Sequence, residues 1–209
     1  MNLKKLRLIK YFFFNLIYGK IKNVISAKNS RFIKIQKINF KPSNKYFIYK
    51  LKKGRLFSNS VNDAAYLVNN CLVSGPSYQF RIDNKMRVIN GKIKENIVLK
   101  YGTPKICKKI QSNVFSLLTG GAGKNNYWHW LFDVLPRIAI YEKSKFKKKN
   151  DLFLFPSLSK SYQRESIFNL NISEEKILDG EKNKHFISEN LLATDHPTVI
   201  KNNPSRSVE

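Results

Sequence analysis

VFSLLTGGAGKNNYWHWLFDVLPR, residues 114 to 137, is the stretch that decides the fold. The run from Val114 to Leu118 is short and apolar, with β-branched and aromatic residues, and predicts a buried strand. A glycine turn follows it. Asn125 and Asn126 come next, and their side chains suit the N-cap of a helix that begins at Tyr127. The stretch therefore predicts a strand, a tight turn and a helix, in that order.

The expected helix has two faces. Apolar residues recur at helical spacing at Leu131, Leu135 and Ile138, and polar residues recur every four positions at Asn125, His129, Asp133 and Arg137. Pro136 lacks an N–H and crowds the preceding turn, so the helix should kink or restart there, with the proline in a first turn. The pairing of His129 with Asp133 precedes that break.

The turn Gly120-Gly121-Ala122-Gly123 places a strand end beside a helix N-terminus, an arrangement that can bind phosphate through backbone N–H groups. Gly121 and Gly123 are the candidate phosphate contacts. A Walker A loop, however, needs Ser or Thr where Asn125 stands, and the dinucleotide fingerprint needs glycine where Asn126 stands. The alternative interpretation is a tight connection that packs the helix against its strand.

His129 and Asp133 form a candidate pair of general base and orienting carboxylate. Imidazole titrates near neutral pH, and a carboxylate on one ring nitrogen fixes the tautomer of the other. Such a base can take the proton from a hydroxyl group as its oxygen attacks an electrophilic carbon. The structural alternative is that both side chains only pin the helix to its neighbours.

Composition points to a folded, strongly basic chain of one large or two small domains. The 209 residues are 42% hydrophobic and 13% aromatic and carry a formal charge of +25, with no Asp or Glu before Asp63. Such a charge suggests an anionic partner. Most of the cations are lysine, as in a coding bias toward Lys, Asn and Ile, whereas specific readers of nucleic acid lean on arginine. We therefore expect no specific nucleic-acid partner.

The N-terminal segment, residues 1–25, reads as basic and amphipathic. Apolar residues at helical spacing alternate with Lys and Arg over residues 2 to 22, so the segment could lie on anionic lipid or dock on its own domain. The apolar stretch from Tyr11 to Tyr18 is too short to span a bilayer. A signal peptide would need a small-residue cleavage site, and none follows before Lys28.

No metal site is expected. Cys71 and Cys107 match no metal spacing, and His185 and His196 are interpreted as surface or cap residues.

The remaining pattern predicts a mixed α/β chain. Strands are expected within 31–52 and at 81–83, 97–101, 151–155, 176–178 and 191–194, and a helix at 162–170. Residues 61–74 fit either a strand or a helix. From Val114 onward, strand and helix alternate, which is typical of a parallel sheet.

The string NYWHWLFDVLPR, residues 126 to 137, resembles the signature of glycosyltransferase family 61, which includes capsular polysaccharide biosynthesis proteins. Residues 69–75 are similar to the strand region upstream of that signature. Residues 162–165 and 170–172 are similar to a downstream arginine-containing helix and its turn, where Asn171 replaces a glycine.

The resemblance implies an inverting transferase of capsule or lipopolysaccharide biosynthesis that uses a nucleotide-sugar donor, a saccharide acceptor and no metal or other cofactor. It implies a GT-B fold in which residues 110–200 form the Rossmann-like N-terminal half, after a β-rich region at 26–109 and before a loose tail at 201–209. His129 and Asp133 would be catalytic, and Asn126, Tyr127, Trp128 and Arg137 would bind substrate near the crevice between the halves.

Family members continue past the equivalent of Leu192 into a donor-binding half, and nothing matching it precedes Glu209. We therefore expect little or no transfer activity from this chain alone, and a cytoplasmic protein, peripheral at the inner face of the membrane. The competing hypothesis is a basic membrane-surface or polyanion-binding module without catalysis, whose binding would fall steeply with salt and ignore His129.

Overall fold

The computed structural model describes residues 3–40, 44–59, 63–82, 88–118 and 124–195. Within these ranges the chain is mixed α/β, and its strands join in one 12-stranded sheet. The strands are β1 (Val24–Ile25), β2 (Ile33–Phe40), β3 (Asn44–Lys52), β4 (Arg55–Phe57), β5 (Asp63–Val68), β6 (Cys71–Val73), β7 (Tyr78–Ile82), β8 (Val88–Asn90), β9 (Lys108–Ser116), β10 (Leu152–Phe155), β11 (Ile177–Asp179) and β12 (His185–Thr194). The helices are α1 (Leu3–Tyr18), α2 (Ile97–Tyr101), α3 (Tyr127–His129), a π-helical turn (Trp130–Val134), α4 (Leu135–Glu142) and α5 (Ser161–Asn169), with short 3-10 turns at Ala27–Asn29, Ile93–Glu95 and Glu174–Lys176.

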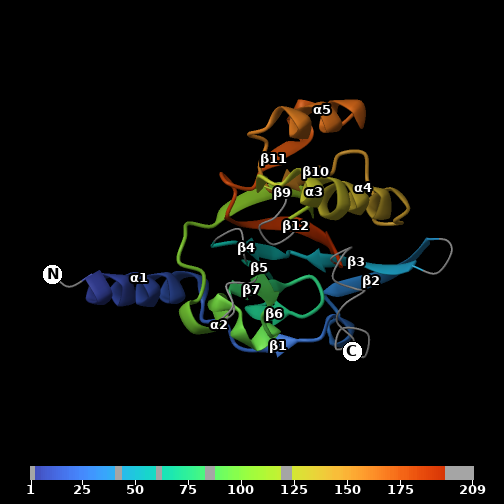
Figure 1. Ribbon diagram of the computed structural model, residues 1–209. Coiled ribbons are helices and arrows are strands. Elements are labelled where there is room, and N and C mark those ends of the chain that lie inside the picture. The colour runs from blue at the N-terminus through green and yellow to red at the C-terminus, as the bar shows by residue number, and fades with distance from the viewer. Residues whose placement is uncertain (1–2, 41–43, 60–62, 83–87, 119–123, 196–209) are drawn as a thin grey trace.

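The sheet has a parallel part and an antiparallel part. β12, β9, β10 and β11 lie side by side in that order and are all parallel. This part confirms the strand and helix alternation expected from Val114 onward, with helices α3, α4 and α5 connecting the strands (Figure 1). The antiparallel part contains the hairpin of β2 and β3 and the strands β4, β5, β7 and β8.

β12 joins the two parts. On one edge it pairs in parallel with β9, and on the other it pairs antiparallel with β4 near its start and with β3 near its end. In Figure 1 it crosses the middle of the molecule as a red strand. The strands on both sides of residue 110 therefore belong to one sheet.

Residues 61–74, which fit either a strand or a helix, contain strands β5 and β6. The tight turn between them is made by Asn69 and Asn70, with φ values of 49° and 59°. Two consecutive residues with positive φ form the kind of turn whose twist matches that of paired strands, and asparagine tolerates this conformation. Residues 61–74 therefore form strands because Asn69 and Asn70 favour a tight turn, a property that the apolar periodicity does not show.

The strand expected at residues 97–101 is wrong, because Ile97–Tyr101 is the helix α2. The side chain of Asn96 accepts a hydrogen bond from the backbone N–H of Val98, which caps the first turn. Gly102, at φ 66°, ends the helix in a conformation that suits glycine. Local capping at both ends thus overrides the β-branched composition of this short run.

The central helix confirms the expected restart at the proline. Asn126 caps α3 by accepting from the backbone N–H of His129. A π-helical turn then runs from Trp130 to Val134, and α4 begins at Leu135 with Pro136 in its first turn. The extra residue of a π-turn frees the proline from a helix interior, and such turns are frequent at functional sites.

The turn after α5 keeps the geometry of a glycine although asparagine occupies it. Asn171 has a φ of 54°, and the backbone N–H of Ile172 donates to the carbonyl of Ile167. This is the pattern of a helix C-cap, in which asparagine is the usual substitute for glycine.

α1 extends away from the sheet (Figure 1), its middle contacts α2 through Tyr11, and its last residue, Tyr18, contacts the start of β12. Among the helices within the described ranges, none is both long enough and apolar enough to cross a bilayer.

His185, which we expected at the surface, is buried, with 2% of its surface exposed. It opens β12, and its ring stands edge-on to Tyr18 and Phe57, with centroid distances of 5.2 and 5.4 Å. Its Nδ1 lies 2.7 Å from the carbonyl oxygen of Lys105. Burial lowers the pKa of His185 to about 4. The apolar neighbour Phe186 could have indicated burial of His185, but the lysines on its other side favoured a surface position. His196 lies outside the described residues.

His185 should make the protein sensitive to acid. Because its folded-state pKa lies below the ordinary value of 6.5, the unfolded chain binds the proton first as the pH falls. Stability is unaffected above about pH 6.5 and is lost between about pH 6.5 and pH 4, by up to about 3 kcal/mol. Urea denaturation at pH 7 and pH 4 measures this loss. His185→Gln should shrink it, whereas equal losses in both proteins would contradict the assignment.

Candidate functional site

The candidate site is built on α3 and the π-helical turn, where His129 and Asp133 meet. Nδ1 of His129 lies 2.6 Å from Oδ2 of Asp133. The side chain of His129 is 34% exposed, whereas that of Asp133 is 1% exposed. Because a carboxylate oxygen can only accept, Nδ1 of the neutral ring carries the proton and Nε2 carries the lone pair. The pair therefore consists of a partly accessible base held by a buried carboxylate.

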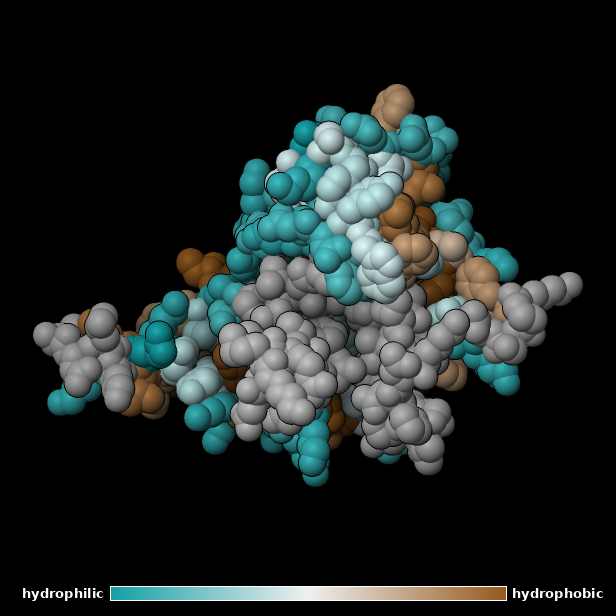
Figure 2. Space-filling view, viewed as in Figure 1, coloured by the Kyte–Doolittle hydropathy of each residue, from teal (hydrophilic) through white to brown (hydrophobic). Residues whose placement is uncertain are grey.

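Three aromatic side chains surround this pair at the surface. Tyr127, Trp128 and Phe132 are 57%, 52% and 50% exposed. The Trp128 ring lies 4.9 Å from the ring of His129 and 5.0 Å from that of Phe132, between centroids. We call Tyr127, Trp128 and Phe132 the aromatic surface. Figure 2 shows pale residues beside brown, apolar ones at the surface where α3 and α4 lie in Figure 1.

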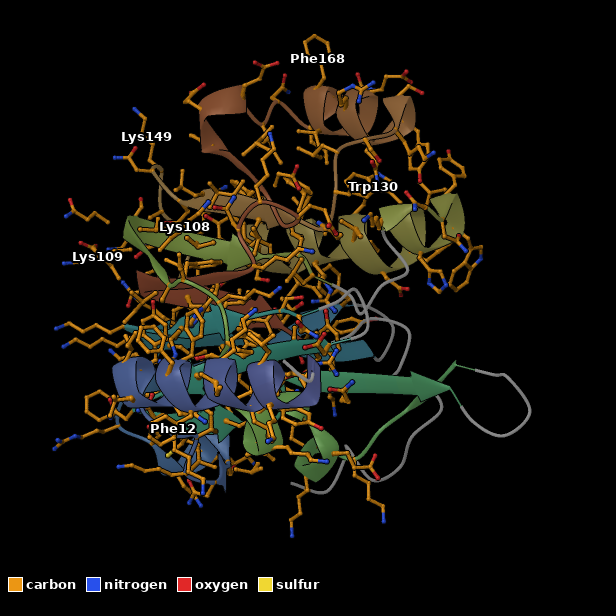
Figure 3. The ribbon with its side chains drawn as sticks, turned by 90° about the vertical axis from the view of Figure 1, so that its left-hand side faces the viewer. Phe12, Lys108, Lys109, Trp130, Lys149 and Phe168 are labelled. Carbon is orange, nitrogen blue, oxygen red and sulfur yellow. The ribbon has the colours of Figure 1, made fainter. Side chains whose placement is uncertain are left out.

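Trp130 is the buried counterpart of Trp128. It is 0% exposed, and its indole Nε1 donates to Oγ of Ser166 on α5 at 2.8 Å. Its ring also lies against Phe155 of β10. Trp130, which Figure 3 labels, therefore fixes the helix to α5 and the sheet. Trp128 lies on the solvent-exposed side of the same helix.

Arg137, the fourth polar residue of the expected face, lies behind the pair. It is 2% exposed, and its Nε donates to the carbonyl oxygen of Asp133 at 3.1 Å. Burial lowers its pKa, and the tyrosines Tyr66 and Tyr78 and the carboxylates of Asp133 and Asp195 oppose that shift. In this arrangement the guanidinium has almost no surface to offer a ligand, and it supports the turn that carries Asp133.

The pair lies on the segment that follows the carboxyl end of β9, and further polar groups gather at that end of the sheet. Ser116, the last residue of β9, shares a 2.8 Å hydrogen bond with the hydroxyl of Tyr66. At the end of β12, Asp195 accepts a 2.8 Å hydrogen bond from the hydroxyl of Tyr49. Carboxyl ends of parallel strands are where open α/β sheets bind ligands.

The structure brings some of the expected site residues together and leaves others apart or undescribed. His129 and Asp133 are in direct contact, Tyr127 and Trp128 lie exposed beside them, and Asn126 is exposed and caps their helix. Gly121 and Gly123 lie outside the described residues. Across the described ranges, no three His, Cys, Asp or Glu side chains gather as a metal site would require. Cys71 and Cys107 are free thiols.

Sequence reasoning missed three residues of this region. Phe132 was not assigned a role, although its position one turn after Trp128 predicts that they share a face. Ser116 could have been identified, because it is a polar residue inside an apolar run. Tyr66 gave no signal, because only the pairing of distant strands brings its hydroxyl to Ser116.

Comparisons with protein-family models, with curated proteins and with solved structures found no match to this chain.

Proposed function

We propose that this protein takes part in glycosyl transfer in polysaccharide biosynthesis. The donor is a nucleotide sugar and the acceptor is a saccharide. The transfer inverts the configuration at the anomeric carbon and uses no metal ion. The chain supplies the acceptor side and the catalytic base. This proposal joins the family resemblance of residues 126 to 137 to the arrangement of their side chains.

The observation that carries the proposal is the 2.6 Å contact between the buried Asp133 carboxylate and the partly exposed His129 ring. The carboxylate holds the proton on Nδ1, so Nε2 is the atom that accepts a proton from outside. A saccharide hydroxyl placed at Nε2 would lose its proton as its oxygen attacks the donor sugar. Asp133 then stabilises the imidazolium that forms.

The aromatic surface supports a saccharide as the substrate that reaches His129. Exposed aromatic rings at a site offer apolar faces, and the C–H groups of a pyranose ring present a matching apolar face. Trp128 and Phe132 stand within one helical turn of His129 and share its side of the helix. A sugar stacked on Trp128 would therefore lie within reach of the base.

The sheet order supports a Rossmann-like half. Taken in chain order, β9, β10, β11 and β12 are the first to fourth strands, and their spatial order is third, second, first, fourth. Nucleotide-binding doubly wound sheets begin with this order and bind ligands where it reverses, between the first and fourth strands. The segment that carries His129 follows β9, one of the two strands at that point.

Trp128→Ala should weaken the binding of neutral oligosaccharides by about tenfold, or about 1.4 kcal/mol, because a stacking surface is lost. Isothermal titration with a panel of oligosaccharides from surface polysaccharides measures the change. Phe168→Ala is the matched control, since Phe168 is an aromatic residue 80% exposed on α5. If both variants bind the oligosaccharide as tightly as the wild type does, Trp128 has no part in recognition. If no oligosaccharide of the panel binds the wild-type protein, the proposed acceptor site is refuted.

A further inference from the structure

α1 presents a broad apolar face to solvent. Its exposed large apolar residues recur at spacings of three and four and are Leu6 (44%), Leu8 (64%), Ile9 (60%), Phe12 (73%), Phe13 (55%), Leu16 (75%) and Ile17 (52%). Seven large apolar side chains exposed on one helix exceed what scattered surface residues explain. Figure 3 shows Phe12 on this helix, on the opposite end of the molecule from Phe168.

The face that docks α1 on the protein is a different one. Tyr11 packs on Tyr101 with ring centroids 4.7 Å apart. The hydroxyl of Tyr18 accepts a 2.9 Å hydrogen bond from the backbone N–H of Cys107, and its carbonyl accepts from Arg55. Tyr11 and Tyr18 are seven residues apart and so lie on one side of the helix. The protein therefore holds α1 by its aromatic and polar side and leaves the apolar side outward.

Cations gather beside this outward face. Lys5 and Lys10 of α1 are exposed. Burial lowers the pKa of Lys105, the charges of Lys184 and Lys10 lower it further, and those of Asp63 and Glu181 oppose the shift. Lys108 and Lys109, exposed at the start of β9, and Lys149 lie on the left-hand side of Figure 3, above α1. An apolar helix face flanked by lysines has the composition of segments that lie in the headgroup region of anionic membranes.

We propose that α1 docks this protein on an anionic lipid bilayer, with the helix parallel to the surface. Leu6, Ile9, Phe12, Phe13, Leu16 and Ile17 would enter the acyl boundary, and Lys10, Lys105 and Lys184 would contact lipid phosphates. A second copy of the chain is the less suitable occupant, because it would bring together two chains that each carry a formal charge of +25. The proposal does not depend on the glycosyl transfer.

Co-sedimentation of the whole chain with vesicles tests this assignment. The wild-type protein should bind vesicles rich in phosphatidylglycerol and leave pure phosphatidylcholine vesicles largely unbound. The double variant F12Q/L16Q should lower the partition coefficient at least about tenfold, because glutamine keeps the helix but removes two inserted side chains. F168Q/L170Q is the matched control, with a Phe and a Leu exposed on and just after α5, and it should bind as the wild type does.

The charge contribution is tested separately. K10Q/K105Q/K184Q should weaken binding and reduce its salt dependence, whereas K28Q/K37Q/K45Q, which removes three lysines exposed elsewhere, should change it less. Circular dichroism checks that each variant keeps its helix content.

Three outcomes would overturn the proposal. The first is a wild-type protein that ignores anionic vesicles. In the second, F12Q/L16Q binds anionic vesicles as tightly as the wild type, whereas K10Q/K105Q/K184Q binds them more weakly. That result would show a general polyanion-binding surface and no insertion of α1. In the third, sedimentation equilibrium without lipid shows an oligomer that F12Q/L16Q dissolves, which assigns the face to self-association.

Discussion

His129→Ala is expected to lower kcat for sugar transfer by about 10²–10⁴-fold, the usual contribution of a positioned general base. The assay supplies the protein, expressed from its native gene, with a nucleotide-sugar donor and a saccharide acceptor and follows the release of nucleoside diphosphate. The ring is 34% exposed on a capped helix, and circular dichroism checks that the variant keeps its fold after a partner of the buried Asp133 is removed. KM for the acceptor should change much less than kcat, because the proton transfer occurs only in the transition state.

The split between kcat and KM separates a base from a merely structural histidine. Loss of a base should lower kcat alone, whereas loss of a structural contact should also raise KM or lower the stability of the protein. Asp133→Asn should reduce kcat by a similar factor, since the amide can donate to Nδ1 and reverse the tautomer. Glu165→Gln, an exposed charge change on α5, is the control. A kcat that survives His129→Ala would refute the catalytic assignment.

Trp130→Ala is expected to cost about 3–5 kcal/mol in the free energy of unfolding, as for other fully buried large aromatic residues. Its ring packs against Phe155, and its indole N–H is bonded to Ser166, so the substitution opens a cavity between the helix, α5 and β10. Urea denaturation followed by circular dichroism measures the loss. Trp130→Phe should cost less, because it refills most of the space and loses mainly the hydrogen bond.

Trp128→Ala is the matched variant for this measurement. Trp128 is half exposed, so its removal should change the free energy of unfolding by no more than about 0.5 kcal/mol. Similar losses for the two tryptophans would mean that the helix does not hold Trp130 in the core in the way described.

The local patterns around residue 114 predicted the right elements because each has its own signal. Asn126 as a cap, Pro136 as a restart and the contact of His129 with Asp133 all follow from rules within one or two turns of helix. The alternation of strand and helix after Val114 predicted a parallel arrangement, which the pairing of β9, β10, β11 and β12 confirms. The sequence could not predict which tryptophan is buried, because helical spacing alone does not distinguish the buried Trp130 from the exposed Trp128.

Features that depend on distant strands were out of reach. Nothing near Tyr66 indicates that its hydroxyl meets Ser116, and nothing near His185 indicates that Tyr18 covers it. Arg137 shares the expected polar face, but the segments packed over it bury it, and a helical wheel contains no such information. In α2 the opposite happened, since the caps Asn96 and Gly102 outweighed a strand-like composition.

The position of β12 has a consequence for how the chain reaches its folded state. This strand is the last of the described elements to leave the ribosome, yet it fills the gap between β9 and the pair β3 and β4. Until it arrives, both of its neighbours expose unpaired backbone edges that invite pairing with other molecules. During its synthesis the nascent chain is therefore expected to be most prone to aggregation just before residues 185–194 emerge.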